Sequence, residues 1–319
     1  MNAKNKILIT GTSGFVGFHV ASYFLNKDYI VYGVDNHNNY YDIKLKIKRC
    51  NLLKKYKKFF FIKDDIQNKS FSSLLGKIKP DVIIHLAAQA GVRFSYKNPF
   101  KYIDYNITGF LNLLESMKKY KLNNLIYASS SSIYGNVKKY PIKENFEFNP
   151  ENFYGLTKVF NEKLVDVYLK NYQINSVGLR MFTVYGELGR PDMFIPKIIN
   201  NLKTRKFIQL YNNGNHYRDF TYVGDVSKII FKLSNANFLK NKKNLILNIC
   251  SGKSISIIKI IKLISQSINI KPLVKKLSFQ KGDMLKTHGN NKKLIFLIGK
   301  FNFTDITKGI KKTLDFKSF

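Results

Sequence analysis

Short apolar runs rich in β-branched residues alternate with longer amphipathic stretches over the first 180 residues. This alternation predicts a parallel sheet with helices on both faces, because the runs have strand length and the stretches between them have helical length and pattern. Helices are expected, for example, at Phe15–Asn26 and Thr157–Lys170. The predicted strands are Lys6–Thr10, Tyr29–Asp35, Phe59–Ile62, Asp81–His85, Asn124–Ala128 and Ile174–Arg180. The expected fold class is α/β, with a doubly wound parallel sheet.

The pattern loosens after Arg180. Loops are expected at Tyr185–Met193 and Tyr211–Tyr217, and later helices near Ser256–Asn269 and Thr304–Phe316. A chain of 319 residues can hold a cofactor domain and a smaller substrate lobe. We expect residues 1–180, completed by part of 218–252, to form the cofactor domain. Residues 181–319 are expected to form mainly a C-terminal substrate-binding lobe.

The chain carries 54 Lys and Arg against 20 Asp and Glu, a net charge of +34. Such an excess suits a nucleic-acid-binding protein, and its best local support is Lys44–Lys58, which holds eight basic residues and no acidic one. Elsewhere the lysines are scattered, without a zinc-finger, RRM or basic-zipper signature. We therefore interpret most of the charge as solvated surface and expect no specific nucleic-acid partner.

No uninterrupted apolar run reaches the roughly 18 residues that a membrane-spanning helix needs. The N-terminal residues contain no hydrophobic signal region with a cleavage site. A cytoplasmic protein without membrane insertion is expected. Cys50 and Cys250 predict neither a disulfide framework nor a zinc site, and are expected to be packing residues.

A glycine-rich loop follows the first predicted strand and opens the first predicted helix. Its glycines permit a tight turn and let a pyrophosphate approach the helix N-terminus. A flexible loop would explain the glycines alone equally well. The residues of this candidate cofactor loop are Gly11, Gly14, Phe15, Val16 and Gly17.

Asp35 strengthens the cofactor interpretation, because it ends the second apolar run 24 residues after Gly11. A carboxylate there accepts hydrogen bonds from an adenosine ribose and repels a 2′-phosphate, so a Rossmann domain that prefers NAD to NADP is predicted. Asn36 follows directly and is a further candidate. Asp65 and Ile66 follow the third strand and are candidates for the adenine site, although Asp65 fits a plain turn residue as well.

Tyr154 and Lys158 are four residues apart, which places them on one face of a helix. A nearby ammonium stabilises a phenolate, so Tyr154 can act as a base near neutral pH. Chance alone can produce such a pair in a chain rich in both residue types. The hydroxyl run Ser129–Ser132 supports the pair, because it follows a strand that should end at the ligand-binding edge of the sheet.

The sequence resembles the extended short-chain dehydrogenases/reductases, and among them the UDP-glucuronate 4-epimerases. The similarity runs from Lys6 to about Gly309. The motifs that carry it are VDNHNNYYD (34–42), HLAAQAGVRFS (85–95), YASSSSIYG (127–135), LRMFTVYGELGRPDM (179–193) and YRDFTYVGDV (217–226).

The resemblance implies roles for particular residues. Ser130, Tyr154 and Lys158 match the catalytic residues of the family. The matched cofactor positions are Leu86, Ala87, Ala88 and Asn106, and the matched substrate positions are Arg93, Tyr211, Arg218 and Asp283, of which Arg218 and Asp283 hold the nucleotide diphosphate and its ribose. In the implied reaction a hydride leaves carbon 4 of a UDP-sugar and a proton leaves its 4-hydroxyl, which forms a transient 4-keto sugar. The hydride then returns to the opposite face and the oxygen is protonated again. A homodimer that needs no metal is expected.

Related enzymes share this intermediate, and residues around it separate them. The family's dehydratases carry Asp-Glu after the catalytic hydroxyl, its decarboxylases carry Glu at position 132, and its UDP-galactose-type epimerases carry Asn at position 183. This chain has Ser131, Ser132 and Thr183 there, together with Arg190. These four side chains are expected to bind the carboxylate of UDP-glucuronate, although Arg190 could instead meet a phosphate or solvent.

Several departures and alternatives stay open. Glu187-Leu188 replaces the usual Pro-Trp before Arg190, and His216 and Gln280 are unusual near the nucleotide. A UDP-glucose 4-epimerase, a UDP-glucuronate decarboxylase or a non-enzymatic NAD-binding sensor would also fit parts of the pattern. The complete set of Ser130, Tyr154 and Lys158 argues against the sensor.

Overall fold

Residues 6–235, 244–278 and 284–316 are described by the computed structural model. By contacts these residues divide into two compact units. Unit 1 comprises residues 1–135, 147–181 and 226–247, and unit 2 comprises residues 136–146, 182–225 and 248–319.

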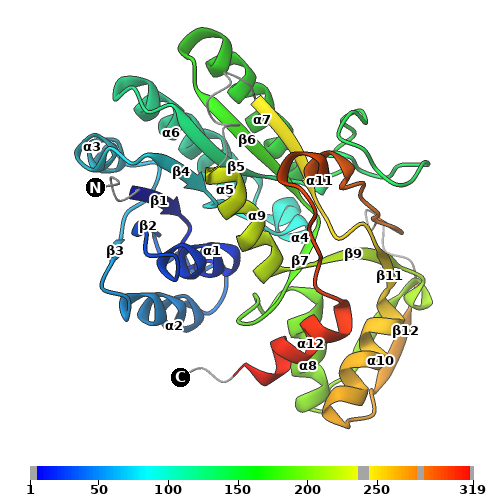
Figure 1. The fold of residues 1–319 in the computed structure, drawn as a ribbon. Coiled ribbons are helices and arrows are strands. Elements are labelled where there is room, and N and C mark those ends of the chain that lie inside the picture. Colours follow the sequence, from blue (N-terminus) through cyan, green and yellow to red (C-terminus); the bar gives the residue numbers. More distant parts are fainter. Residues whose placement is uncertain (1–5, 236–243, 279–283, 317–319) are drawn as a thin grey trace. The chain divides into compact units, whose positions relative to one another are not determined.

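A seven-stranded sheet of order β10-β6-β5-β4-β1-β2-β3 organises unit 1 (Figure 1). Its six N-terminal strands pair in parallel. The predicted doubly wound α/β fold is therefore confirmed, and every predicted strand is present with bounds that differ by no more than a few residues. The strands are β1 (Lys6–Thr10), β2 (Ile30–Val34), β3 (Phe59–Ile62), β4 (Val82–His85), β5 (Asn124–Ser130), β6 (Asn175–Met181) and β10 (Asn244–Ile249).

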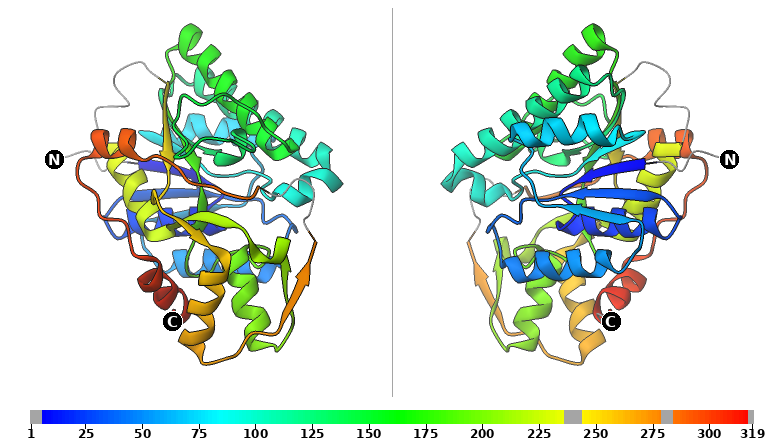
Figure 2. Two further views of the ribbon diagram at one scale, coloured as in Figure 1. Left: turned by 90° about the vertical axis from the view of Figure 1, so that its right-hand side faces the viewer. Right: turned by 90° about the vertical axis from the view of Figure 1, so that its left-hand side faces the viewer.

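Helices cover both faces of this sheet (Figure 2). On one face the apolar sides of α3, α6 and α7 pack on β1, β4 and β5, with Phe71, Phe110 and Val165 completely buried. Burial of side chains of this size stabilises the fold by about 1.5–3 kcal/mol each. The helices of this part of the chain are α1 (Phe15–Leu25), α2 (Ile43–Lys54), α3 (Lys69–Ile78), α4 (Val92–Lys97), α5 (Pro99–Tyr102), the π-helical turn η1 (Ile103–Thr108), α6 (Gly109–Lys119), the 3-10 turn η2 (Ser131–Ile133), α7 (Phe153–Tyr172) and α9 (Val223–Asn235).

Helix α7 begins four residues before its predicted start at Thr157. Asn152 caps the helix, because its side-chain oxygen accepts a hydrogen bond from the Gly155 amide at 2.8 Å. Gly155 suggests a loop in the sequence, but here it allows close packing, since a Cβ atom on it would lie 2.6 Å from the Ser132 carbonyl oxygen. The earlier start places Tyr154 in the first turn of α7.

Unit 2 contains two small sheets, one of order β11-β9-β7 and one that pairs β12 with β8. The helices predicted near Ser256–Asn269 and Thr304–Phe316 are confirmed as α10 and α12. The expected loop at Tyr211–Tyr217 contains a 3-10 turn, η3. The elements are β7 (Thr183–Tyr185), α8 (Phe194–Lys203), β8 (Ile208–Tyr211), η3 (Asn212–Gly214), β9 (Tyr217–Tyr222), β11 (Ser254–Ser256), α10 (Ile257–Ile268), β12 (Val274–Leu277), α11 (Lys292–Ile298) and α12 (Ile306–Asp315). Among the described helices, none combines the length and apolar character required to cross a bilayer.

Candidate active site

The glycine loop joins β1 to α1 and runs close to the end of β4. Gly11 has a φ of +76°, and a Cβ atom on it would lie 2.8 Å from the Ala87 amide nitrogen. A Cβ atom on Gly17 would lie 2.0 Å from the Gly11 carbonyl oxygen. Only glycine fits at these two positions. Gly14 precedes α1 without a side-chain cap, so the helix N-terminus can offer backbone amides to a diphosphate, as the NAD interpretation requires.

Asp35 lies just after β2 and is 8% exposed. Its carboxylate accepts hydrogen bonds from the Ser13 amide at 3.1 Å and the His37 amide at 2.8 Å, which fixes it beside the glycine loop. The His37 ring meets the Ser13 hydroxyl at 2.8 Å, and burial lowers the pKa of this imidazole. The position fits a ribose-binding carboxylate.

Two cations of the basic stretch 44–58 are buried, whereas the sequence pattern suggested a solvated surface. Lys46 is 5% exposed and Arg49 is fully buried. Arg49 donates to the Ser13 carbonyl at 2.9 Å and to the Tyr41 hydroxyl at 2.6 Å, so it ties α2 to the glycine loop. These two side chains therefore lie in the interior and cannot contribute to a nucleic-acid-binding surface.

Asp65 connects two loops at the carboxyl edge of the sheet. It accepts a hydrogen bond from the Asn36 side chain at 2.7 Å and one from the Gln67 amide at 3.1 Å. The second contact is that of a turn residue, and the first brings Asp65 to the segment that follows Asp35. Ile66 next to it is 5% exposed. Both interpretations of Asp65 are compatible with these contacts.

Asn106 joins the segment after β4 to α7 by hydrogen bonds. Its side chain accepts from the Gln89 amide at 2.7 Å and donates to the Gln89 carbonyl at 3.0 Å and the Thr157 hydroxyl at 3.1 Å. At the start of the same segment, the Leu86 and Ala87 amides donate to the Thr10 hydroxyl at 3.2 Å each. The residues Leu86, Ala87, Ala88 and Asn106 thus lie along one continuous path between the glycine loop and α7.

Lys158 is 1% exposed and donates to the Ala128 carbonyl at 2.9 Å. Its ammonium lies 5.9 Å from the centroid of the Tyr154 ring, so its charge is close enough to favour the phenolate. Burial lowers the pKa of Lys158 to about 8, an effect that Glu162 opposes. Ser130 is 7% exposed at the end of β5, and its hydroxyl accepts from the Ser132 amide at 3.1 Å. The three candidate catalytic residues therefore occupy adjacent elements of unit 1, with Ser131 in the turn beside them.

The remaining substrate candidates have separate settings. Arg190 forms two hydrogen bonds with the Asp192 carboxylate, at 3.0 and 2.8 Å, a contact that the sequence interpretation did not include. Arg218 donates to the Tyr217 and Leu285 carbonyls at 2.9 and 3.2 Å. Thr183 lies in β7 and Tyr211 ends β8, while Arg93 is exposed in α4. Asp283 and Gln280 lie outside the described residues.

The carboxylate-binding cluster stays a prediction. Ser131 and Ser132 belong to unit 1, and Thr183 and Arg190 belong to unit 2. The Asp192 contact adds a condition to it: a substrate carboxylate has to replace Asp192 as the partner of Arg190, or share the guanidinium with it.

Sequence reasoning missed Asp219, which is fully buried in unit 2 next to Arg218. Its carboxylate accepts from the amides of Ser251, Gly252 and Gly289 at 2.9, 3.1 and 3.2 Å. Burial raises the pKa of Asp219 to about 6. The residue joins the segments around Ser251 and Gly289 to β9, and its sequence signal is its place in the RDF motif.

Comparison with known proteins agrees with this geometry. Residues 7–250 match the NAD dependent epimerase/dehydratase family. An uncharacterised protein of Methanocaldococcus jannaschii is 40% identical over 98% of this chain and 95% of its own length. A UDP-glucuronate 4-epimerase of Thermodesulfobacterium geofontis is 37% identical over 97% of this chain and 94% of its own length. The crystal structure of a Bacillus cereus UDP-glucuronic acid 4-epimerase in complex with UDP-glucuronic acid and NAD is 33% identical, with a TM-score of 0.91 over 97% of this chain and 98% of that one. The family expected from the motifs is thereby confirmed: the chain belongs to the NAD dependent epimerase/dehydratase family.

Proposed function

We propose that the protein is an NAD-dependent UDP-sugar 4-epimerase that interconverts UDP-glucuronate and UDP-galacturonate. The observation that carries the proposal is the path within unit 1 from the glycine loop, through Ala87 and Asn106, to α7 with Tyr154 and Lys158. It connects a dinucleotide site to an acid–base residue. The proteins in the comparisons named as UDP-glucuronate 4-epimerases support the choice of substrate.

The residues divide the chemistry among them. When bound, NAD supplies a hydride acceptor and donor for carbon 4 of the sugar. Tyr154 takes the proton of the 4-hydroxyl and later returns one to the oxygen of the resulting ketone, while the hydride returns to the opposite face of carbon 4. The Lys158 ammonium stabilises the phenolate in between, and Ser130 hydrogen-bonds the reacting oxygen. We assign the remainder of the substrate to Arg93, Tyr211, Arg218 and Asp283, most of them in the predicted lobe 181–319.

The preference for a uronic acid is assigned to Ser131, Ser132, Thr183 and Arg190. A 4-keto uronate is a β-keto acid, which loses carbon dioxide when its carboxylate stands perpendicular to the carbonyl plane. Hydrogen bonds to both carboxylate oxygens oppose that alignment, whereas a neighbouring Glu would favour decarboxylation by repulsion. UDP-galacturonate is therefore the expected product, with little UDP-pentose.

The proposal is tested by incubating the NAD-loaded protein with UDP-glucuronate and, separately, with UDP-glucose, and identifying the products by NMR. Tyr154→Phe should lower turnover about 100- to 10,000-fold and leave NAD binding intact. Tyr96→Phe removes a phenol that meets only the Glu151 carbonyl among its described contacts, and serves as the control. A UDP-pentose as the main product, or faster turnover of UDP-glucose, would overturn the choice of substrate.

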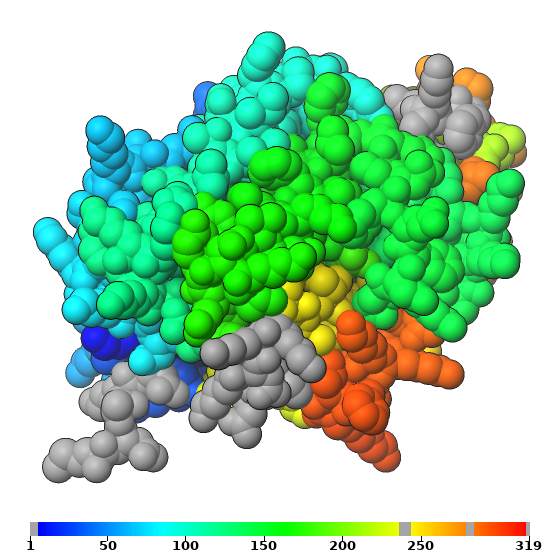
Figure 3. Space-filling view, turned by 90° about the horizontal axis from the view of Figure 1, so that it is seen from above, coloured from blue at the N-terminus to red at the C-terminus, as the bar shows by residue number. Residues whose placement is uncertain are grey.

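We also propose a homodimer formed through the outer face of α6 and α7, which lie side by side in Figure 3. Large apolar side chains are exposed there by 39–53% although the other side of each helix is buried in the core. An apolar face on two adjacent helices suits a second copy, because the same patch can pack on itself about a two-fold axis. The exposed residues are Leu111 of α6 and Phe153, Leu156, Phe160 and Val167 of α7, with Ile103 of η1, a turn that contacts both helices.

Analytical ultracentrifugation tests the dimer. Phe160→Glu should shift the protein to a monomer, because it places a charge in the apolar face. Phe296→Glu makes the same change on a side chain that is 88% exposed in α11, and should leave the dimer intact. A monomeric wild type would refute this assembly.

The cytoplasm, which supplies NAD and UDP-sugars, is the proposed location. The product is proposed to be used in polysaccharide synthesis.

A further inference from the structure

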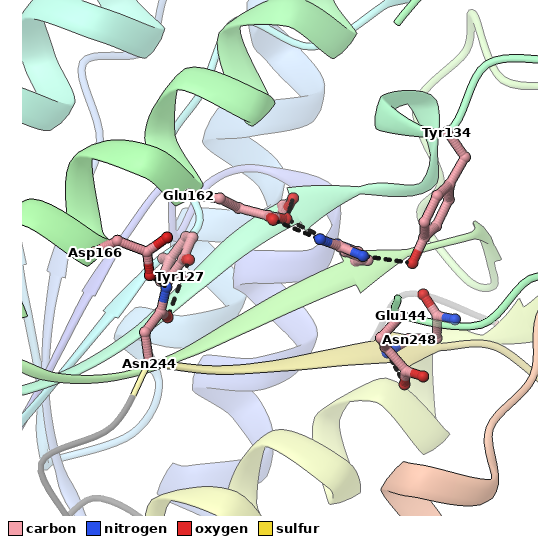
Figure 4. Close-up of polar contacts among 9 residues, drawn as sticks. Tyr127, Tyr134, Glu144, Glu162, Asp166, Asn244 and Asn248 are labelled. Carbon is pink, nitrogen blue, oxygen red and sulfur yellow. Dashed lines mark hydrogen bonds and ion pairs between the residues drawn. The ribbon is translucent and has the colours of Figure 1, made fainter. Parts of the chain in front are cut away.

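A buried ion pair joins α7 to β6 (Figure 4). Glu162 of α7 and Arg180 of β6 are each 3% exposed. Arg180 binds both carboxylate oxygens, with Nη2 at 2.7 Å from Oε2 and Nε at 3.0 Å from Oε1. It also donates to the Tyr134 hydroxyl at 2.8 Å, and the Ser129 hydroxyl donates to Glu162 at 2.5 Å. The orientation of the carboxylate is therefore fixed from two strands and a turn.

Two independent observations place Glu162 close to Lys158. The two residues are four positions apart in α7, so their side chains lie on one face of the helix. The Ala128 carbonyl, which accepts from Lys158 at 2.9 Å, is followed in the chain by Ser129, which donates to Glu162. One stretch of β5 thus holds both ends of an opposite-charge pair in a place with almost no solvent.

We propose that Glu162 is a positioning residue for the reaction: its carboxylate, held by Arg180 and Ser129, keeps Lys158 charged and directed at the end of β5 while Tyr154 exchanges its proton. The inference rests on the proposed function for the role of Lys158. The charge of Lys158 can be measured without substrate, because Lys158 and the groups that act on it all belong to unit 1.

Among the residues that the structure describes, Glu162 is the anion whose charge acts on Lys158. His85 at the end of β4 is buried and uncharged, since burial lowers its pKa to about 3. Tyr154 faces Lys158 from the preceding turn of α7. Arg180 on β6 is engaged with Glu162 itself. Burial pulls the pKa of Lys158 down to about 8 and Glu162 acts in the opposite direction, so loss of the carboxylate would discharge the lysine at lower pH.

The test is the pH profile of the NAD-loaded enzyme with UDP-glucuronate. Glu162→Gln should move the alkaline decline of kcat to lower pH by about one unit or more, with KM changed less than kcat. Asp166→Asn is the matched control: Asp166 lies one turn farther along α7 and accepts from the Asn244 side chain at 2.6 Å, so the variant removes the same charge two turns from Lys158. Its profile should match the wild type.

Two further variants separate charge from folding. Glu162→Gln leaves a buried guanidinium without its carboxylate, which can unfold the protein. Glu162→Gln combined with Arg180→Gln removes both charges and should fold. Its decline should lie at lower pH than that of the wild type but be displaced by less than in Glu162→Gln, because loss of the Arg180 cation offsets part of the effect. Glu162→Asp keeps the charge and should restore the wild-type profile.

A direct titration makes the result independent of turnover. The Lys158 ε-carbon can be followed by NMR in lysine-labelled protein without substrate and assigned by its absence in Lys158→Met. Its titration should move to lower pH in Glu162→Gln and not in Asp166→Asn. If Lys158 titrates alike in all folded variants, or shifts equally in the Asp166 variant, the inference is wrong. If it shifts as expected while no UDP-sugar is epimerised, only the proposed function fails.

Discussion

At the scale of single residues, burial decides which side chains can serve chemistry. Asp35 is ionisable, nearly buried and fixed by two backbone amides. Lys46 and Arg49 are buried as well: Arg49 donates to the Ser13 carbonyl in the glycine loop, and Lys46 donates to the Asn38 side chain. The ribose end of the proposed NAD site therefore combines one anion with two nearby buried cations, and we expect the anion to select the cofactor.

Asp35→Ser should reverse the cofactor preference. A carboxylate about 4 Å from a 2′-phosphate costs about 1–4 kcal/mol, and its removal leaves Lys46 and Arg49 to attract that phosphate. We expect NADP affinity to rise at least about fivefold and NAD affinity to fall, measured by isothermal titration calorimetry. Asp42→Ser, a change at an exposed helix cap, should alter neither affinity. Tighter binding of NADP by the wild type would refute the role of Asp35.

His85 predicts how stability depends on pH. Its ring nitrogen meets the Thr10 hydroxyl at 2.9 Å in the core, and burial lowers its pKa to about 3 from 6.5. Between pH 6.5 and pH 3 the His85 ring is protonated in the unfolded chain but not in the folded chain. The contribution of neutral His85 to the free energy of unfolding is therefore complete above pH 6.5 and is lost as the pH falls towards 3. At pH 5 the loss is about 2 kcal/mol.

Urea unfolding at pH 5 and pH 7.5 measures this loss. His85→Asn keeps a polar partner for Thr10 but cannot gain the charge, so its unfolding free energy should change less between the two pH values than that of the wild type. An equal change of the unfolding free energy in both proteins would show that His85 does not cause the pH dependence.

At the scale of elements, the strands were the most predictable part, because a buried parallel strand is a short apolar run and little else produces one. Strands β1 and β3 match their predicted bounds at both ends. The start of α7 was less predictable. Gly155 suggests a loop in isolation, and only its close approach to Ser132 explains a glycine inside the first turn of a helix.

The cap of α7 gives a prediction at this scale. Asn152→Ala should lower the unfolding free energy by about 1 kcal/mol, since it removes the acceptor of the Gly155 amide. Asn152→Asp retains an acceptor and should stay within a few tenths of a kcal/mol of the wild type. Denaturant midpoints compare the three proteins, and an unchanged midpoint for the alanine variant would mean that water replaces the cap.

The site shows where prediction from sequence stops. Gly11 and Asp35 are recognisable because each follows a predicted strand, and Tyr154 and Lys158 are recognisable by their spacing of four residues. Their partners are not recognisable, because pairing depends on side-chain direction. The sequence shows Arg190 and Asp192 two positions apart but does not say that they bind each other. Glu162 could have been suspected from its spacing to Lys158, whereas Arg180 looks like any residue of a buried strand.

At the scale of the whole molecule, the charge of +34 remains the most unusual property. We expect duplex DNA to bind weakly, with steep salt dependence and no sequence preference, because the charge is spread over the chain and two of the cations in its densest stretch are buried. Fluorescence anisotropy with two unrelated duplexes, at 50 and 200 mM salt, tests this. Tight binding to one duplex at the higher salt would revive a nucleic-acid function.

The position of β10 has a consequence for how the protein is made. This strand begins at Asn244 but lies beside β6, in a sheet whose other strands end by Met181. About three quarters of the chain must therefore leave the ribosome before β6 gains its second neighbour. Until then β6 presents unpaired backbone groups, to which a strand of another nascent chain can attach. Translation that stalls between residues 181 and 244 should leave the product most dependent on chaperones.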